Sequence, residues 1–143
     1  RKVPLYGSGL NVRDWIYVED NCSAIDLVLR KGKSGETYNI GGTPDFPNIE
    51  IVKRILSILG KDESLIEYID DRPGHDRRYA MDYSRISREL GWQPAHSFGE
   101  ALESTVGWYV DNMDWWKRVQ EGKYMEYYRK IYGGRLARNG RQE

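Results

Sequence analysis

The residues best suited to chemistry are the charged side chains of Asp71–Asp82, a stretch with three arginines, a histidine and three aspartates around a Pro-Gly turn. Pro73 fixes one backbone angle and Gly74 permits a positive one, so the chain can reverse sharply there. The turn directs Arg72 and His75 toward the same side. Guanidinium groups offer a fixed fork of donors that matches phosphate oxygens, so the loop suits a pyrophosphate. The alternative is a solvated, charged surface turn.

Further candidate residues lie upstream, in two runs with the composition of strands. Pro4–Gly9 is an extended piece that ends in a glycine-rich turn, and Tyr6 within it offers a flat face to a base, or simply lies half-exposed at the end of a strand. Arg13–Val18 is rich in aromatic and β-branched residues, which predicts a strand. At the start of that strand, a surface arginine paired with Asp14 is one interpretation of Arg13.

The elements that must position these residues follow from hydrophobic spacing and stop signals. Acidic residues at Glu19–Asn21 begin a predicted helix that stops at Gly32. Glu36–Ile40 and Ile66–Ile69 are predicted as short strands. The sequence therefore indicates an α/β protein with a small sheet and several helices.

Asn48 precedes an apolar helical pattern over Ile49–Leu59 and is a good N-cap. Capping alone is the commoner use of asparagine there, although a helix N-terminus also attracts anions. A second helix is predicted from Asp82 or Ser84 to Leu90, stopped by a glycine.

Ser97 and Glu100 have the spacing of a capping box, which predicts the start of a longer helix. The aromatic and apolar residues at helical spacing along it and just after it are interpreted as core: Ala101, Leu102, Thr105, Val106, Tyr109, Val110, Trp115, Trp116 and Val119. A last short helix is predicted over Tyr124–Tyr132, followed by a flexible basic tail over residues 133–143.

Composition excludes several classes of function. The chain has 143 residues, with 22 basic and 22 acidic side chains and a pI near 7.0, so it lacks the basic footprint of a nucleic-acid binder. No apolar run approaches a membrane span. Cys22 is the single cysteine and is expected to pack on a helix, and with only His75 and His96 there is no ligand spacing for a metal.

Five runs together carry a family resemblance: Pro4–Gly7, Asn11–Asp20, Gly35–Gly42, Arg72–Ala80 and Glu89–Pro94. Of these, the Arg-Pro-Gly-His-Asp-Arg-Arg-Tyr-Ala run is the most specific. Over nearly the whole chain the sequence resembles the final third of the dTDP-glucose 4,6-dehydratases, which are extended short-chain dehydrogenase/reductases. The resemblance implies the C-terminal, sugar-nucleotide-binding domain of such an enzyme.

The resemblance also implies binding roles for individual residues. It places Arg13 and Arg72 on the phosphates, with His75 beside them or on the ribose. Asn48 would lie at the phosphate end of the substrate. The residues implied around the nucleoside are Pro4, Tyr6 and Tyr132.

The resemblance implies that the catalytic machinery lies outside this sequence. No Gly-x-Gly-x-x-Gly follows a strand and no tyrosine has a lysine four residues on, so no catalytic residue is expected here. NAD is expected on an N-terminal Rossmann domain missing from this chain. Residues 1–132 would form the substrate-binding fragment, with residues 21–42 belonging to that Rossmann domain.

The implied activity of the parent protein is the conversion of dTDP-glucose to dTDP-4-keto-6-deoxyglucose and water, in deoxysugar biosynthesis. The chain alone is expected to be inactive. The expected partners are the dTDP-sugar, the missing domain and a second copy in a homodimer, with no nucleic acid and no membrane, in the cytoplasm. The alternatives are a related sugar-nucleotide epimerase or decarboxylase, or a non-catalytic nucleotide-sugar binding module.

Overall fold

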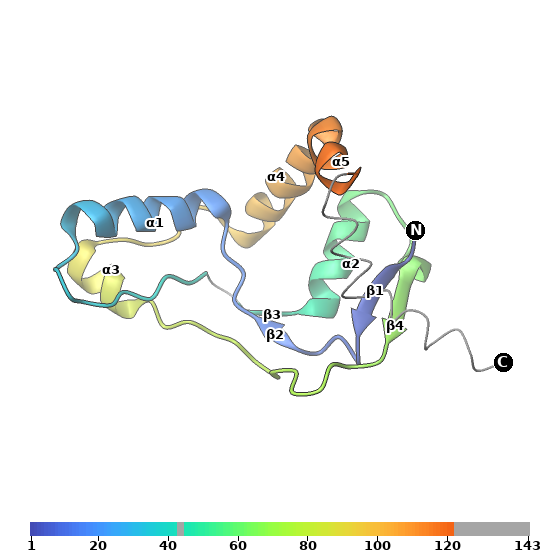
Figure 1. Ribbon diagram of the computed structural model, residues 1–143, viewed down its shortest axis with the longest axis horizontal. Coiled ribbons are helices and arrows are strands. Elements are labelled where there is room, and N and C mark those ends of the chain that lie inside the picture. The colour runs from blue at the N-terminus through green and yellow to red at the C-terminus, as the bar shows by residue number, and fades with distance from the viewer. Residues whose placement is uncertain (43–44, 122–143) are drawn as a thin grey trace. The chain divides into compact units, whose positions relative to one another are not determined.

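The computed structural model describes residues 1–42 and 45–121. The chain divides into two compact units, residues 1–106 and 107–143. Short strands alternate with helices along the chain, as predicted for an α/β protein (Figure 1). In order, the elements are β1 (Val3–Tyr6), β2 (Val12–Arg13), α1 (Val18–Lys31), β3 (Phe46–Pro47), α2 (Asn48–Ile58), the 3-10 turn Glu63–Leu65, β4 (Ile66–Ile69), α3 (Ser84–Leu90), α4 (Phe98–Asp111) and α5 (Met113–Glu121).

The strands form two small pairs in the first unit. β1 pairs with β4 in parallel, with Val3 opposite Ile66, and β2 pairs with β3 in antiparallel fashion. An isolated parallel bridge joins Val12 to Arg78, so the charged loop after β4 runs back along β2. The predicted strand over Ile66–Ile69 is therefore confirmed, and the loop is attached to the framework at both ends.

The helices begin and end close to the predicted residues because their signals are local. α1 ends at Lys31 with Gly32 as its C-cap, and Gly91 ends α3 in the left-handed conformation at a φ of 75°. At the start of α4 the capping box forms as predicted: the Glu100 backbone N–H donates to Ser97 Oγ at 3.4 Å, and the Ser97 N–H donates to a Glu100 carboxylate oxygen at 3.2 Å.

The centre of the core in the first unit lies between α1 and α3. Ala24 and Ile86 are fully buried, and Trp92 packs with them while its indole N–H donates to Ser23 Oγ at 3.0 Å. That bond satisfies the one polar atom that the tryptophan carries into the core. α1 and α3 lie side by side in Figure 1 for this reason.

The two strands predicted over Arg13–Val18 and Glu36–Ile40 are not formed. Only Val12–Arg13 is a strand in the first region, and α1 begins at Val18. The second region has no strand assignment and no β-partner among the described residues. A strand needs a neighbour for its backbone groups, and these segments have none among the described residues.

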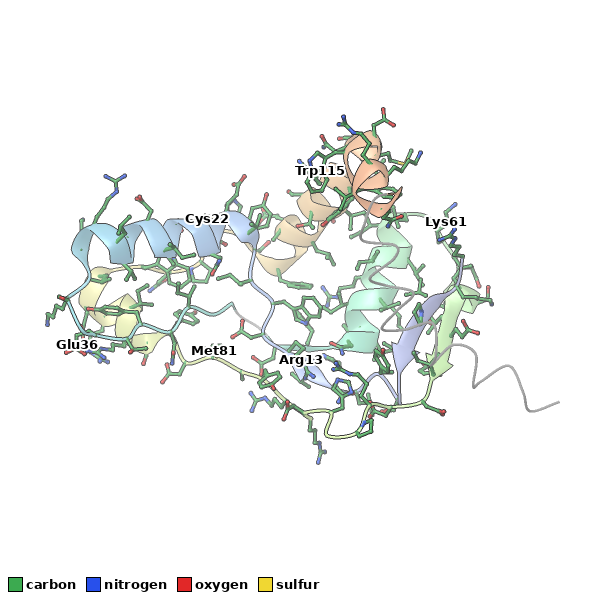
Figure 2. All side chains as sticks on the ribbon, in the orientation of Figure 1. Arg13, Cys22, Glu36, Lys61, Met81 and Trp115 are labelled. Carbon is green, nitrogen blue, oxygen red and sulfur yellow. The ribbon has the colours of Figure 1, made fainter. Side chains whose placement is uncertain are left out.

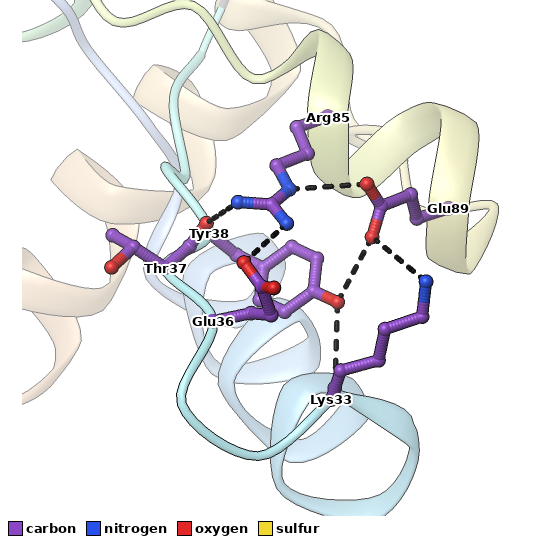
Figure 3. A network of polar contacts seen from close by, with 6 residues as sticks. All are labelled: Lys33, Glu36, Thr37, Tyr38, Arg85 and Glu89. Carbon is purple, nitrogen blue, oxygen red and sulfur yellow. Dashed lines mark hydrogen bonds and ion pairs between the residues drawn. The ribbon is translucent and has the colours of Figure 1, made fainter.

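A polar network attaches the second of these segments to α3 instead (Figure 3). Arg85 donates to a carboxylate oxygen of Glu36 at 2.6 Å, to the carbonyl of Thr37 at 3.1 Å and to Glu89 at 3.1 Å. The Tyr38 hydroxyl donates to the other carboxylate oxygen of Glu89 at 3.2 Å. The segment therefore keeps a fixed position without strand pairing.

One face of α1 is left exposed. Val18, Ile25 and Leu29 lie at helical spacing on it and are 63%, 53% and 83% exposed. Cys22 lies in the same row and is also exposed (Figure 2), so the prediction that it packs is wrong. We call this row, Val18, Cys22, Ile25 and Leu29, the α1 stripe.

In the second unit, the described residues run from Gly107 to Glu121. Tyr109, Val110, Trp115 and Val119 are each about half exposed, so the interpretation of these residues as core is wrong. The Trp108 and Trp115 rings meet edge to face at 5.4 Å between centroids, and contact of this kind does not require full burial. The predicted helix over residues 124–132 and the tail lie outside the described residues. Among the described residues, no helix is long and apolar enough to cross a membrane.

Candidate functional site

The charged loop after β4 turns as its sequence predicts. Gly74 has a φ of 68°, and the His75 backbone N–H donates to the Arg72 carbonyl at 3.1 Å, which closes the turn. At the start of the loop the Arg72 N–H donates to Asp71 Oδ1 at 2.8 Å. The turn therefore holds Arg72 and His75 beside the end of β4.

Tyr6, Arg72 and His75 form one cluster. The Arg72 guanidinium lies over the Tyr6 ring at 5.2 Å from its centroid, and the His75 ring meets the same tyrosine edge to face at 6.0 Å. Within the residues that the structure describes, the Arg72 side chain donates no hydrogen bond and forms no ion pair. Its donors are therefore free for an anion, while the tyrosine holds its position.

Asp71 sets the tautomer and the orientation of the His75 ring. Nδ1 of His75 lies 2.5 Å from Asp71 Oδ1, and the imidazole side chain is only 4% exposed. The hydrogen bond from His75, with the Arg72 N–H and the charges of both residues, holds the pKa of Asp71 below its ordinary value. An ionised carboxylate only accepts, so Nδ1 carries the proton, and Nε2 of the neutral ring is an acceptor.

Arg13 lies in a second cluster, on β2. Its guanidinium donates to the carbonyls of Val12 at 2.7 Å and Asp76 at 3.0 Å, and it lies over the Tyr79 ring at 4.8 Å from the centroid. Arg13 does not pair with Asp14, whose carboxylate accepts backbone N–H groups of Gly42 and Met81 at 2.5 and 3.0 Å. The surface-pair interpretation of Arg13 is therefore wrong.

Two further groups of predicted residues are those on β1, and Tyr132 near the end of the chain. Pro4 and Tyr6 alternate with the buried Leu5 along β1, so Pro4 and Tyr6 lie on the face opposite to Leu5. Tyr132 lies outside the described residues.

Asn48 is the first residue of α2, not its N-cap, and the predicted capping role is wrong. Pro47 occupies the cap position without a side-chain bond. The first two N–H groups of the helix, those of Asn48 and Ile49, donate to the carbonyls of Asn11 and Gly9, each at 3.0 Å. The framework therefore already satisfies two of the four N–H groups that a side-chain cap or an anion could otherwise bind at the start of this helix.

Close contacts with Asp14 and Trp15 explain the two glycines that follow the predicted strand Glu36–Ile40. A side chain at Gly42 would bring its Cβ within 2.0 Å of the Trp15 carbonyl, and one at Gly41 within 2.7 Å of an Asp14 carboxylate oxygen. Only glycine allows this approach. Asp14 thus joins three segments directly beside Arg13.

The buried Asp20 and the exposed His96 form a pair that joins α1 to the segment before α4. Asp20 is 3% exposed and accepts from the Ala95 N–H, the His96 N–H and His96 Nδ1 at 3.1, 3.3 and 2.9 Å. Burial raises the pKa of Asp20, but these bonds and the charge of His96 outweigh it and leave the pKa below its ordinary value. The hydrogen bond between His96 Nδ1 and the Asp20 carboxylate also raises the pKa of His96.

That pair lies at the edge of a cavity of about 220 Å³ between α2 and α4. Apart from Asp20 and His96 the lining is mostly apolar, with Trp15, Phe98 and Leu102 among its members. None of the predicted site residues that the structure describes lines it. The cavity is therefore separate from the arginine clusters.

Asp71, Asp76 and Tyr79 lie in the charged stretch that the sequence indicates, but no individual role is predicted for them. Asp71 stands four positions before His75, a spacing that could have suggested a local pair. No signal in the sequence joins Tyr79 to Arg13, because that contact depends on the backbone bridge between Val12 and Arg78.

Comparison with known proteins gives the relatives of the chain. Residues 1–105 match the family described as GDP-mannose 4,6 dehydratase. The chain is 49% identical over 131 residues to dTDP-glucose 4,6-dehydratase of Xanthomonas campestris pv. campestris, which covers 85% of this chain and 37% of that protein. The chain thus spans much less than two thirds of this relative.

Two solved structures have the same fold over most of the chain. The dTDP-glucose 4,6-dehydratase of Bacillus anthracis str. Ames, in complex with NAD, is 52% identical with a TM-score of 0.78, covering 82% of this chain and 37% of that one. The enzyme of the same name from Streptomyces venezuelae, with NAD and TYD bound, is 45% identical with a TM-score of 0.79, covering 82% and 36%. The resemblance noted in the sequence is confirmed.

Proposed function

Because the chain belongs to the GDP-mannose 4,6 dehydratase family, we propose that it is the substrate-binding portion of an NAD-dependent dTDP-glucose 4,6-dehydratase. The observation that carries this proposal is the pair of arginine–tyrosine stacks at the two ends of the charged loop. Arg72 lies on Tyr6, and Arg13 lies on Tyr79. Both arginines are close enough to Tyr79 for their charges to act on its pKa. Two guanidinium groups held in this way suit the two phosphates of a nucleoside diphosphate.

The nucleoside end is assigned to the residues next to Arg72. Tyr6 has one ring face toward Arg72, and its other face is suited to a thymine base. Pro4 shares the same face of β1. Nδ1 of His75 is bonded to Asp71, so Nε2 is the ring atom left for the substrate, and we assign it to a ribose hydroxyl, which can donate or accept. Asn48 and Tyr132 complete the proposed substrate site.

The described residues do not fit NAD. A dinucleotide fold needs a glycine-rich turn between a strand and a helix, so that pyrophosphate meets the helix N-terminus. The turn with Gly7 and Gly9 after β1 leads to β2 and not to a helix. NAD, which when bound would take a hydride from the sugar and later return it, is therefore assigned to the rest of the parent protein.

The missing part of the parent also explains the α1 stripe and the unpaired segment over residues 36–40. We propose that residues 21–42 complete its Rossmann domain. There the stripe would be buried and the segment would find a neighbouring strand. By the same family analogy, the parent would be a cytoplasmic homodimer.

The chain alone is proposed to be inactive, since it lacks the residues expected to do the chemistry. Purified chain, given NAD and dTDP-glucose, should form no keto-sugar above a no-protein control. Formation of the product would overturn the division between binding and catalytic portions. The full-length protein should form the 4-keto-6-deoxy sugar nucleotide, and a 4-epimer product would favour the epimerase alternative.

The binding site itself is tested in the full-length protein with dTDP and calorimetry. Arg72→Ala and Arg13→Ala should each weaken binding by about 10- to 150-fold, because a charge-assisted hydrogen bond contributes about 1.5–3 kcal/mol. Arg72→Lys should recover only part of the loss, since an ammonium lacks the bidentate fork. Arg88→Ala, an exposed arginine on α3, is the matched control. Equal affinity of all four variants would refute the assignment.

A further inference from the structure

Tyr79 and Asp76 surround Arg13 from the far end of the charged loop. The Tyr79 ring covers the guanidinium at 4.8 Å, and the Asp76 carbonyl accepts from it at 3.0 Å. The Tyr79 hydroxyl in turn donates to the Asp76 carboxylate. We propose that Tyr79, acting with Asp76, is a positioning residue that keeps the Arg13 guanidinium oriented toward a phosphate of the substrate. This inference rests on the proposed function and adds a residue to its site.

The two acceptors of Asp76 have separate tasks. Its carbonyl takes the Arg13 donor and the Asn11 side-chain amide, the latter at 3.1 Å. Its carboxylate is taken by Tyr79. A carboxylate so close to Arg13 could otherwise form an ion pair with it and occupy the donors that a phosphate needs. The tyrosine hydroxyl therefore keeps Asp76 from competing with the substrate.

The backbone fixes Tyr79 in this place. The Val12 N–H donates to the Arg77 carbonyl at 2.9 Å, and the Tyr79 N–H donates to the Val12 carbonyl at 3.1 Å. Tyr79 is thus held to the residue next to Arg13 by the main chain. The main chain therefore places the Tyr79 ring beside Arg13 before any contact between the two side chains forms.

The chemistry of the hydroxyl agrees with its role as a donor. The hydrogen bond to Asp76 and the charge of that residue raise the pKa of Tyr79, against the opposing charges of Arg13 and Arg72. The phenol therefore stays protonated and keeps donating to Asp76. In Arg13, two of the five N–H donors bind backbone carbonyls, and the others bind nothing within residues 1–42 and 45–121.

The test is a double-mutant cycle between Tyr79 and Arg13 in the full-length protein, with dTDP affinity measured by calorimetry. Tyr79→Leu removes the ring face and should weaken binding about 2- to 30-fold. Tyr79→Phe keeps the ring and loses only the hydroxyl, so it should fall between wild type and Tyr79→Leu. In the Arg13→Ala background, Tyr79→Leu should cause no further loss. Tyr68→Leu on β4 is the control for an exposed tyrosine away from the cluster, and it should leave affinity unchanged.

The outcomes separate this inference from the proposed function. If Arg13→Ala itself leaves dTDP affinity unchanged, the phosphate site is wrong. If Arg13→Ala weakens binding but Tyr79→Leu does not, or weakens it equally in both backgrounds, only the positioning role is wrong. If Tyr79→Leu fails to fold, the test is made with Tyr79→Phe. The unfolding midpoint of Tyr79→Phe is first compared with that of the wild type to show that it folds.

Discussion

Several hydrogen bonds converge on Asp20, so the substitution Asp20→Asn should weaken the attachment of the Ala95–His96 segment and leave the rest of the fold intact. The substitution keeps the shape of the side chain but replaces one accepting oxygen with an N–H₂ group. Asp20 Oδ1 accepts from Ala95 and from the His96 ring, while Oδ2 accepts from the His96 backbone. Even in the better orientation of the amide, a donor then faces the donor of His96.

The magnitude follows from burial. Asp20 is 3% exposed, so bulk water replaces little of the lost bond at its side chain. An unsatisfied buried polar group costs about 1–3 kcal/mol. Opening of the Ala95–His96 segment should therefore become about 5- to 150-fold more frequent.

Hydrogen exchange of the Ala95 and His96 amides in the full-length protein measures this opening directly. Asp26→Asn is the matched control, since Asp26 is an exposed carboxylate on the same helix that pairs with Arg30. Exchange at Ala95 and His96 should accelerate in Asp20→Asn and stay unchanged in Asp26→Asn. Equal exchange in both variants would refute the view that these bonds hold the segment.

Three other outcomes follow from the structure. The bond to Asp20 raises the pKa of His96 above its ordinary value of 6.5, so the stabilisation it contributes is complete below pH 6.5 and lost as the pH rises through the raised pKa. The difference in urea midpoint between wild type and His96→Gln should shrink accordingly, and a difference that grows with pH would contradict this sign. Ile86→Ala, at a fully buried position, should lower the free energy of unfolding by about 2–5 kcal/mol in denaturant titrations. Ser97→Ala should lower it by about 1 kcal/mol through loss of the cap, and no change would show that the Glu100 bonds do not depend on the serine.

The helices could be predicted well from the sequence because residues close to each boundary determine where the helix begins and ends. Gly91 needs no distant partner to end α3, and Ser97 meets Glu100 within one turn of α4. The same holds for the reversal at Gly74. Local geometry decides each of these features, so a local pattern is enough to predict it.

The features that the sequence could not predict depend on distant groups. Trp15, Ile16 and Tyr17 have the composition of a strand, but no neighbouring strand pairs with them in the described residues. Asn48 is a residue type that often caps a helix, yet the first N–H groups of α2 donate instead to backbone carbonyls about 40 residues upstream. Arg72 is predicted from the chemistry of its loop and Arg13 from the family resemblance, whereas the contact of Tyr79 with Arg13 could not be predicted, because only the tertiary fold brings these two residues together.

Because β1 pairs with β4, β1 stays unpaired during synthesis until β4 has also been made. Val3 pairs with Ile66, about 60 residues later in the chain. At a synthesis rate of about 5–20 residues per second, β1 leaves the ribosome about 3–12 s before its partner exists. In that interval its backbone is open to pairing with other nascent chains. Pro4, in the middle of β1, has no N–H to offer such a partner. The proline proposed to line the nucleoside site would thus also protect the young chain from association.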